Sequence, residues 1–229
     1  MTGFRHPSEG YVFVVTYGRS GSTLVQNLLN ALPGCLIRGE NNNALFPLYK
    51  SWRALVRSPD ICRMRQAREV SDPSHPWFGA EAIDTDSYAR SLCAGFASQV
   101  LRPPPQVRLC GFKEIRTISP EADFMEYLAF LNAYFPRPRF IFNTRNHDDV
   151  VKSSWWRQHE PAEVRQMMRS AEAVFDTFAA AHPDRSIRLH YDDYVRNHRQ
   201  FEPLFELLGH RPPPERMHAV LSTRLTHAT

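Results

Sequence analysis

The chain lacks the residue patterns by which metal sites and redox pairs are recognised. Its four cysteines are never spaced as C-x-x-C, and its ten histidines show no H-E-x-x-H or similar ligand spacing. These absences argue against zinc-dependent catalysis and against a dithiol redox centre. We therefore expect a protein that needs no metal.

Long apolar segments and runs of one charge are missing too. No segment is apolar over the roughly 20 residues of a membrane-spanning helix, and residues 1–10 lack the apolar core of a secretory signal. The net charge is +4, but no run of Lys or Arg marks a nucleic-acid-binding tail. We expect a cytoplasmic protein that has no membrane span and binds no nucleic acid.

Linkers, repeats and low-complexity tracts are also absent. The chain has 229 residues, 42% of them hydrophobic, which suffices for one α/β domain with a substantial core. No Gly/Ser linker divides it and no motif recurs at a fixed period. We expect residues 1–229 to form a single domain.

Strand-like and helix-like segments alternate along the chain. Apolar, β-branched runs predict strands over residues 11–16, 35–37, 107–112, 139–144 and 186–191. Periodic apolar positions predict helices over residues 22–31, 41–56, 84–101, 120–134 (with Ser119 as N-cap), 148–156, 162–181 and 201–208, the last helix ending at Gly209. The alternation predicts a parallel sheet with helices on both faces, in which ligands bind beyond the carboxyl ends of the strands.

Residues 57–79 are polar and show no regular period, and residues 210–229 follow the last predicted helix. We expect both segments to lie over the substrate or the donor. Trp77 is a candidate for an aromatic contact with the acceptor. Trp155 and Trp156 could stack on a sugar ring, but packing in a helix core is the favoured interpretation for both.

A glycine-containing loop, Thr16-Tyr-Gly-Arg-Ser-Gly-Ser-Thr23, joins the first predicted strand to the first helix. Glycine allows close approach of an anion, and the amides and dipole at a helix N-terminus attract it. A nucleotide-hydrolysing P-loop has a lysine after its last glycine. Here that position is Ser22, and the cation is Arg19 instead. The loop favours a phosphate-bearing ligand other than a triphosphate, the alternative being a glycine-rich turn without a ligand.

The stretch that begins at Arg19 resembles the first motif of the sulfotransferases that use 3′-phosphoadenosine 5′-phosphosulfate (PAPS). In that family the loop binds the 5′-phosphosulfate. The resemblance implies a single-domain, three-layer fold like that of P-loop NTPases, with a central parallel sheet flanked by helices. It also implies donor contacts by Arg19, Ser20, Gly21, Ser22, Thr23 and Leu24.

A second stretch, from Phe140 to Ser153, is similar to the family's 3′-phosphate motif. Arg145 ends a predicted strand and Ser153 follows eight residues later, the spacing of the two phosphate ligands in the family. The planar guanidinium of arginine suits bidentate phosphate binding. The proline usual two residues after the arginine is His147 here. Alternatives are a salt bridge from Arg145 to Asp148 or Asp149 and an ordinary surface role for Ser153.

Two weaker similarities concern the donor as well. Tyr191 begins a Tyr-Asp-Asp-Tyr segment that resembles one in which the tyrosine lies near the nucleotide, although a buried strand-end tyrosine is an equal alternative. Arg224 lies in a C-terminal segment that often closes over the 3′-phosphate in the family. An exposed arginine without a ligand is the alternative there.

The general base cannot be copied from the cytosolic members of the family. Their histidine position, two residues after Lys113, holds Ile115 here. Carbohydrate-directed and several bacterial members instead place a glutamate just after the second strand, where this chain has Glu40. The resemblance implies Glu40 as the base, with Arg19 and Lys113 stabilising the transferring sulfuryl group. Glu114 is the second choice for the base. The alternative for Glu40 is a carboxylate that merely stabilises a helix N-terminus, and the alternative for Lys113 is an ion-pair partner of Glu114 or Glu40.

The resulting expectation is a PAPS-dependent sulfotransferase that acts on a hydroxyl of a carbohydrate or other small-molecule acceptor and releases 3′,5′-adenosine bisphosphate (PAP). A P-loop-type small-molecule kinase is the alternative enzyme, against which Ser22 counts. A non-catalytic nucleotide-binding module is the alternative outside enzymes.

Overall fold

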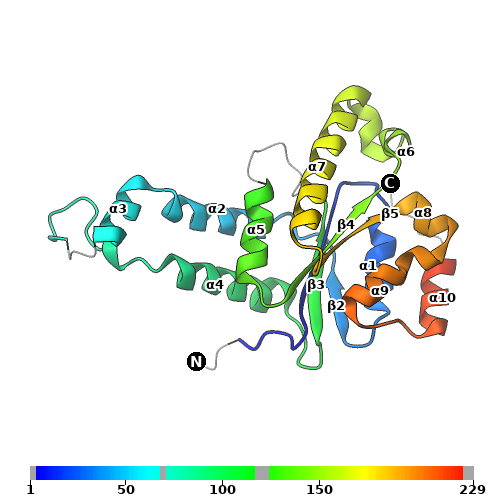
Figure 1. Ribbon diagram of the computed structural model, residues 1–229, viewed down its shortest axis with the longest axis horizontal. Helices are drawn as coiled ribbons and strands as arrows, with labels where there is room; N and C mark the ends of the chain where they lie inside the picture. Colours follow the sequence, from blue (N-terminus) through cyan, green and yellow to red (C-terminus); the bar gives the residue numbers. More distant parts are fainter. Residues whose placement is uncertain (1–3, 68–70, 117–123, 224–229) are drawn as a thin grey trace.

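The predicted strands form one parallel sheet in the computed structural model, which describes residues 4–67, 71–116 and 124–223 (Figure 1). The strands are β1 (Gly10–Thr16), β2 (Cys35–Arg38), β3 (Leu109–Glu114), β4 (Pro138–Thr144) and β5 (Ser186–His190). They lie in the order β2-β3-β1-β4-β5, and each neighbouring pair is parallel. The carboxyl ends of all these strands therefore meet at one edge, as the sequence predicted.

The central strand β1 is buried on both faces of the sheet. Tyr11, Phe13 and Val15 enter one core cluster, whereas Val12 and Val14 enter the other. This is the period of two that a strand imposes on its side chains. A continuous apolar run thus becomes a strand covered by helices on both sides.

The helices divide between the two faces of the sheet (Figure 1). One face is covered by α1 (Ser22–Asn30), α9 (Glu202–Leu208) and α10 (Pro214–Ser222), whose apolar side chains pack with Val12 and Val14. The other is covered by α2 (Leu45–Val56), α4 (Thr85–Phe96), α5 (Phe124–Tyr134) and α7 (Pro161–Ala181). The short helices α6 (His147–Val151) and α8 (Tyr191–Arg196) follow directly on β4 and β5. The three-layer α/β architecture is thereby confirmed.

Helices α2 and α4 pack against each other and extend away from the sheet as an arm (Figure 1). At the far end of this arm lies α3 (Pro59–Ala67), in the segment predicted to be irregular, so that prediction was wrong for these residues. The start signal was present, because the Ser58 hydroxyl accepts from the Ile61 amide (3.3 Å) ahead of Pro59 and Asp60. Only Ile61 is buried in α3, so its apolar period was too weak to find.

Other boundaries also differ from the prediction. α2 begins at Leu45 rather than at residue 41, because Asn42 and Asn43 have φ angles of 57° and 55°, outside the right-handed helical region. The predicted helix over 148–156 is α6 followed, after a break, by a 3₁₀ helix at Ser154–Gln158. Gly209 ends α9 as predicted, but α9 is not the last helix, since α10 follows. The predicted N-cap Ser119 lies outside the described residues.

Candidate active site

The glycine-containing loop leaves β1 and leads into α1, as its sequence predicted. Gly21 precedes the helix with φ 82° and ψ 8°, and no side chain of the described residues caps the helix there. Amides in the first turn of a helix lack intrahelical acceptors and attract anions. Arg19 also has a positive φ, 69°. For a residue with a side chain this conformation costs about 1–2 kcal/mol, and such strain concentrates at functional sites.

The hydroxyl groups of the loop differ in what they contact. The hydroxyls of Thr16 and Ser20 are buried and lie 2.6 Å apart, and Asn143 on β4 donates to the Ser20 carbonyl at 2.8 Å. The buried hydrogen bonds of Ser20 therefore fix the conformation of the loop. Ser22 and Thr23 begin α1, and the Leu24 amide donates to the Gly21 carbonyl at 3.0 Å.

Four residues predicted to bind the donor come together from three strand ends. Arg19 Nε donates to Ser153 Oγ at 2.9 Å. Arg145 Nη1 donates to the Arg19 carbonyl at 3.1 Å, and its guanidinium carbon lies 4.5 Å from the centre of the Tyr191 ring. The Arg145 Nε is buried and has no hydrogen-bond partner among the described residues. A buried donor without an acceptor is unfavourable unless a ligand supplies one.

Within the described residues, Arg145 forms no ion pair with Asp148 or Asp149, the two alternative partners that the sequence suggested. Asp148 instead accepts from Arg165 (2.8 Å). The contacts of Arg145 with Arg19 and Tyr191 orient its guanidinium without neutralising its charge. This chemistry fits a phosphate group.

A second charged cluster lies at the ends of β2 and β3. Lys113 Nζ contacts Glu40 Oε1 at 2.5 Å, and Arg116 Nη1 contacts Glu40 Oε2 at 2.7 Å. Burial raises the pKa of Glu40. The hydrogen bonds and positive charges of Lys113 and then Arg116 lower it by more than burial raises it, so the pKa lies below its usual value. Glu40 is a partly exposed, ionised carboxylate at neutral pH.

Glu114, the second candidate for the base, has a different environment. Its side chain is 1% exposed. One oxygen accepts from the amides of Asn41 (3.2 Å) and Asn43 (2.8 Å), and the other from those of Ile115 (2.9 Å) and Arg116 (3.1 Å). By accepting hydrogen bonds from these four amides, the Glu114 carboxylate fixes the loop between β2 and α2 against the end of β3. Glu40 stands in that loop.

The two clusters sit at neighbouring strand ends. β1 carries the glycine-containing loop and pairs with β3, with Val14 opposite Lys113. Within the described residues, no hydrogen bond or ion pair joins Arg19 to Glu40 or Lys113. Arg224, the remaining predicted donor contact, lies outside the described residues.

Two tryptophans belong to this region although a core position was favoured for both. Trp156 donates its indole N–H to the Gly18 carbonyl at 3.0 Å and packs against the core cluster that contains Tyr11 and Phe13. Trp155 is 42% exposed, so a core position is wrong for it. A Cβ on Gly18 would lie 2.5 Å from Trp155 Cζ2, so the indole rests against the loop. Their place in a 3₁₀ helix rather than an α-helix puts them there.

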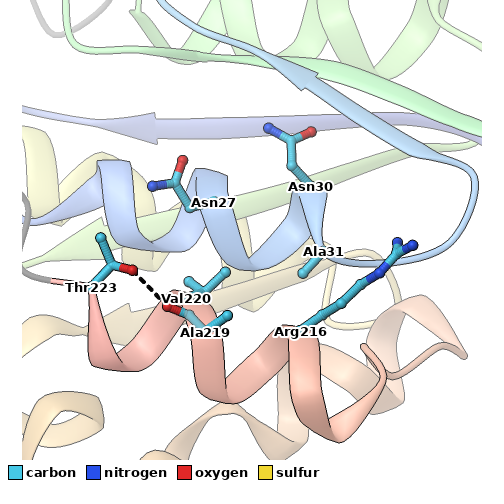
Figure 2. A pocket seen from close by; sticks show the side chains of 7 residues that line it. All are labelled: Asn27, Asn30, Ala31, Arg216, Ala219, Val220 and Thr223. Carbon is cyan, nitrogen blue, oxygen red and sulfur yellow. Dashed lines mark hydrogen bonds between the residues drawn. The ribbon is translucent and has the colours of Figure 1, made fainter.

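The C-terminal helix forms a separate groove with α1, of about 500 Å³ (Figure 2). It is lined by Asn27, Asn30, Ala31, Arg216, Ala219, Val220 and Thr223. Asn30 is already engaged, since its side chain donates to the Ile37 carbonyl (2.9 Å) and accepts from the Ile37 amide (2.7 Å). Residues 214–222 therefore pack along α1, and a donor-covering role for residues 210–229 stays a prediction.

Among the residues that the structure describes, no three His, Cys, Asp or Glu side chains gather in a way that could hold a metal ion. No helix in the same residues has both the length and the apolar character needed to cross a bilayer.

A parallel α/β sheet whose central strand leads through a glycine-containing loop into a helix has the architecture of a P-loop-like fold. The chain belongs to the sulfotransferase family, whose sequence model matches residues 11–210. No curated protein matches the chain by sequence.

Solved structures resemble the fold. The sulfotransferase domain of the Synechococcus PCC 7002 olefin synthase matches with a TM-score of 0.59 at 19% identity, covering 98% of this chain and 81% of that one. The sulfotransferase domain from the curacin biosynthetic pathway matches with a TM-score of 0.54 at 16% identity, covering 93% and 77%. At these identities the likeness concerns the fold.

Proposed function

We propose that the protein transfers a sulfuryl group from PAPS to a hydroxyl of a carbohydrate or other small-molecule acceptor. The observation that carries the proposal is Arg145, a partly exposed arginine whose buried Nε lacks a hydrogen-bond partner among the described residues. It stands beside Arg19 and Ser153 at the loop, in a chain of the sulfotransferase family. That position suits a nucleotide with a phosphate on its 3′ oxygen.

The donor would be held at two points. Arg145 and Ser153 would bind the 3′-phosphate, and the loop residues 19–24 would bind the 5′-phosphosulfate. The bound donor supplies the sulfuryl group and leaves as PAP. Tyr191 supports the Arg145 guanidinium from behind, since the ring lies 4.5 Å from its carbon.

Glu40 is the group proposed to take the hydroxyl proton of the acceptor, on a carboxylate oxygen. It is ionised at neutral pH, but its lowered pKa makes it a weak base while Lys113 and Arg116 hold it. An anionic ligand near Lys113 would compete with Glu40 for the lysine, which would raise the pKa of Glu40. Lys113 would thereby couple donor binding to the strength of the base.

The test compares ligands by thermal unfolding and calorimetry. Wild-type protein is measured with PAP and, separately, with ATP plus Mg²⁺. A ligand present at a hundred times its dissociation constant adds about 2.7 kcal/mol to the free energy of unfolding. We expect this gain with PAP and its loss in Arg145→Ala. Arg169→Ala is the matched control, because exposed Arg169 on α7 contacts only Gln166 (2.8 Å) among the hydrogen bonds described.

Either result is decisive for the donor. Stabilisation by PAP that survives in Arg169→Ala and disappears in Arg145→Ala supports the 3′-phosphate site. Stabilisation by ATP plus Mg²⁺ with none by PAP would overturn the proposal in favour of a kinase.

A further inference from the structure

A buried tyrosine hydroxyl links the two donor-binding strand ends. Tyr17 follows β1 directly and its side chain is fully buried. Its hydroxyl lies 2.7 Å from Glu172 Oε1 on α7 and 2.9 Å from the backbone nitrogen of Arg145, the first residue after β4. The hydroxyl has one proton to donate and lone pairs to accept with.

The directions of these hydrogen bonds follow from charge and burial. Burial raises the pKa of Tyr17 strongly, so the hydroxyl is protonated at any physiological pH. Its proton is best donated to the Glu172 carboxylate at 2.7 Å rather than to the Arg145 carbonyl at 3.1 Å, because charge-assisted hydrogen bonds are the stronger kind. A lone pair is then left to accept the Arg145 amide.

Glu172 is itself fixed by donors from other elements. His147 Nε2 lies 2.9 Å from Glu172 Oε1, and Arg188 Nη2 lies 2.8 Å from Oε2. Arg188 is held in turn by Asp176 at 2.6 Å. The carboxylate is thus immobilised between α7, α6 and β5. His147 stands where the resembling motif has proline, and here it contributes a contact to this cluster.

We propose that Tyr17 and Glu172 are positioning residues that hold Arg145 in place for recognition of the 3′-phosphate. The inference rests on the proposed function. Tyr17 fixes the Arg145 backbone, while the contacts with Arg19 and Tyr191 fix only its guanidinium. An arginine held at both ends loses little freedom when it binds a ligand, which improves affinity. This hydroxyl and carboxylate need not touch the ligand to determine how well it is bound.

The experiment measures how strongly the protein prefers PAP over AMP, which lacks the 3′-phosphate. Dissociation constants for both are obtained by calorimetry, and their ratio isolates the contribution of the 3′-phosphate. Tyr17→Phe should lower this ratio about tenfold, or about 1.4 kcal/mol, with little change for AMP. Glu172→Gln should also lower the preference for PAP over AMP. Arg145→Ala sets the floor, with a ratio near one.

Tyr127→Phe is the matched control. The Tyr127 hydroxyl is also buried, but it has no hydrogen-bond partner among the described residues. Its removal should leave the ratio unchanged. Should Tyr17→Phe fail to fold, Glu172→Gln tests the positioning role by itself, since it leaves the buried Tyr17 side chain unchanged.

The outcomes separate this inference from the function on which it rests. A wild-type protein that binds PAP no better than AMP overturns both. A wild-type preference for PAP that persists in Tyr17→Phe and Glu172→Gln overturns the positioning role alone. A parallel loss of affinity for PAP and AMP would indicate a merely structural role and would also overturn it.

Discussion

Replacement of Gly21 by alanine should destabilise the fold and weaken the proposed donor site, because both effects arise from displacement of the Tyr191 ring. Gly21 has φ +82°, and a Cβ there would lie 2.0 Å from Cδ2 and 2.4 Å from Cε2 of Tyr191. Ordinary van der Waals contact begins at 3.4 Å, so the ring has to move. The same ring supports Arg145, whose guanidinium carbon is 4.5 Å from its centre.

The expected magnitude has two parts. The left-handed backbone conformation costs an alanine about 1–2 kcal/mol. Forcing a side chain into a packed site costs about 1–3 kcal/mol more. The free energy of unfolding should therefore fall by about 2–5 kcal/mol. Loss of the cation–π contact, worth about 1 kcal/mol, should weaken PAP binding about fivefold.

Urea unfolding and PAP calorimetry measure the two effects. Gly79→Ala provides the control for backbone strain alone, because Gly79 has φ +85° and nothing lies within 4 Å of its Cβ position. In a Tyr191→Ala background the clash is absent, so Gly21→Ala should then cost only as much as Gly79→Ala. The reasoning is refuted if Gly21→Ala costs no more than Gly79→Ala in the wild-type background.

Two further predictions concern Glu40. Glu40→Gln should lower sulfuryl-transfer turnover by about 10²–10⁴-fold, the usual contribution of a general base, while PAP still binds. Unchanged turnover would exclude Glu40 as the base. Absence of turnover in the wild-type protein with every acceptor tried would favour a non-catalytic binding module. Arg116→Gln should raise the pKa of Glu40, because Arg116 is one of two cations that hold it below its usual value. A lowered carboxyl pKa keeps the ionised form until the pH falls through that pKa, so the acid limb of the kcat/KM profile should move to higher pH in Arg116→Gln. An acid limb that stays in place or moves lower would contradict this.

Local sequence was sufficient to predict the sheet and its loop. Every residue of β1 is buried, so its uninterrupted apolar sequence indicates both a strand and a strand that is covered on both faces of the sheet. The loop could be identified because the tight turn from β1 into α1 needs a glycine at a defined position. Gly21 occupies it, and the space where its Cβ would stand is filled by Tyr191.

Contacts between distant residues could not be predicted in the same way. Tyr17 lies in the glycine-containing loop, but Glu172 is 155 positions away and nothing in the sequence links the two residues. Their pairing depends on how α7 packs over the sheet. Helices α2 and α4 of the arm were predicted, but α3 was missed, since a helix that buries only Ile61 shows little apolar period.

Glu40 and Glu114 show why sequence alone left two candidates for the base. Both follow or end strands at the same sheet edge, so the pattern treats them alike. They differ in their neighbours, because Glu114 accepts from four backbone amides and lies 3.5 Å from Arg116, whereas Glu40 is held by the side chains of Lys113 and Arg116. Backbone amides are fixed by the fold, whereas a lysine side chain can be drawn away by a competing anion. Of the two, Glu40 is therefore the carboxylate whose proton affinity an anionic donor could change.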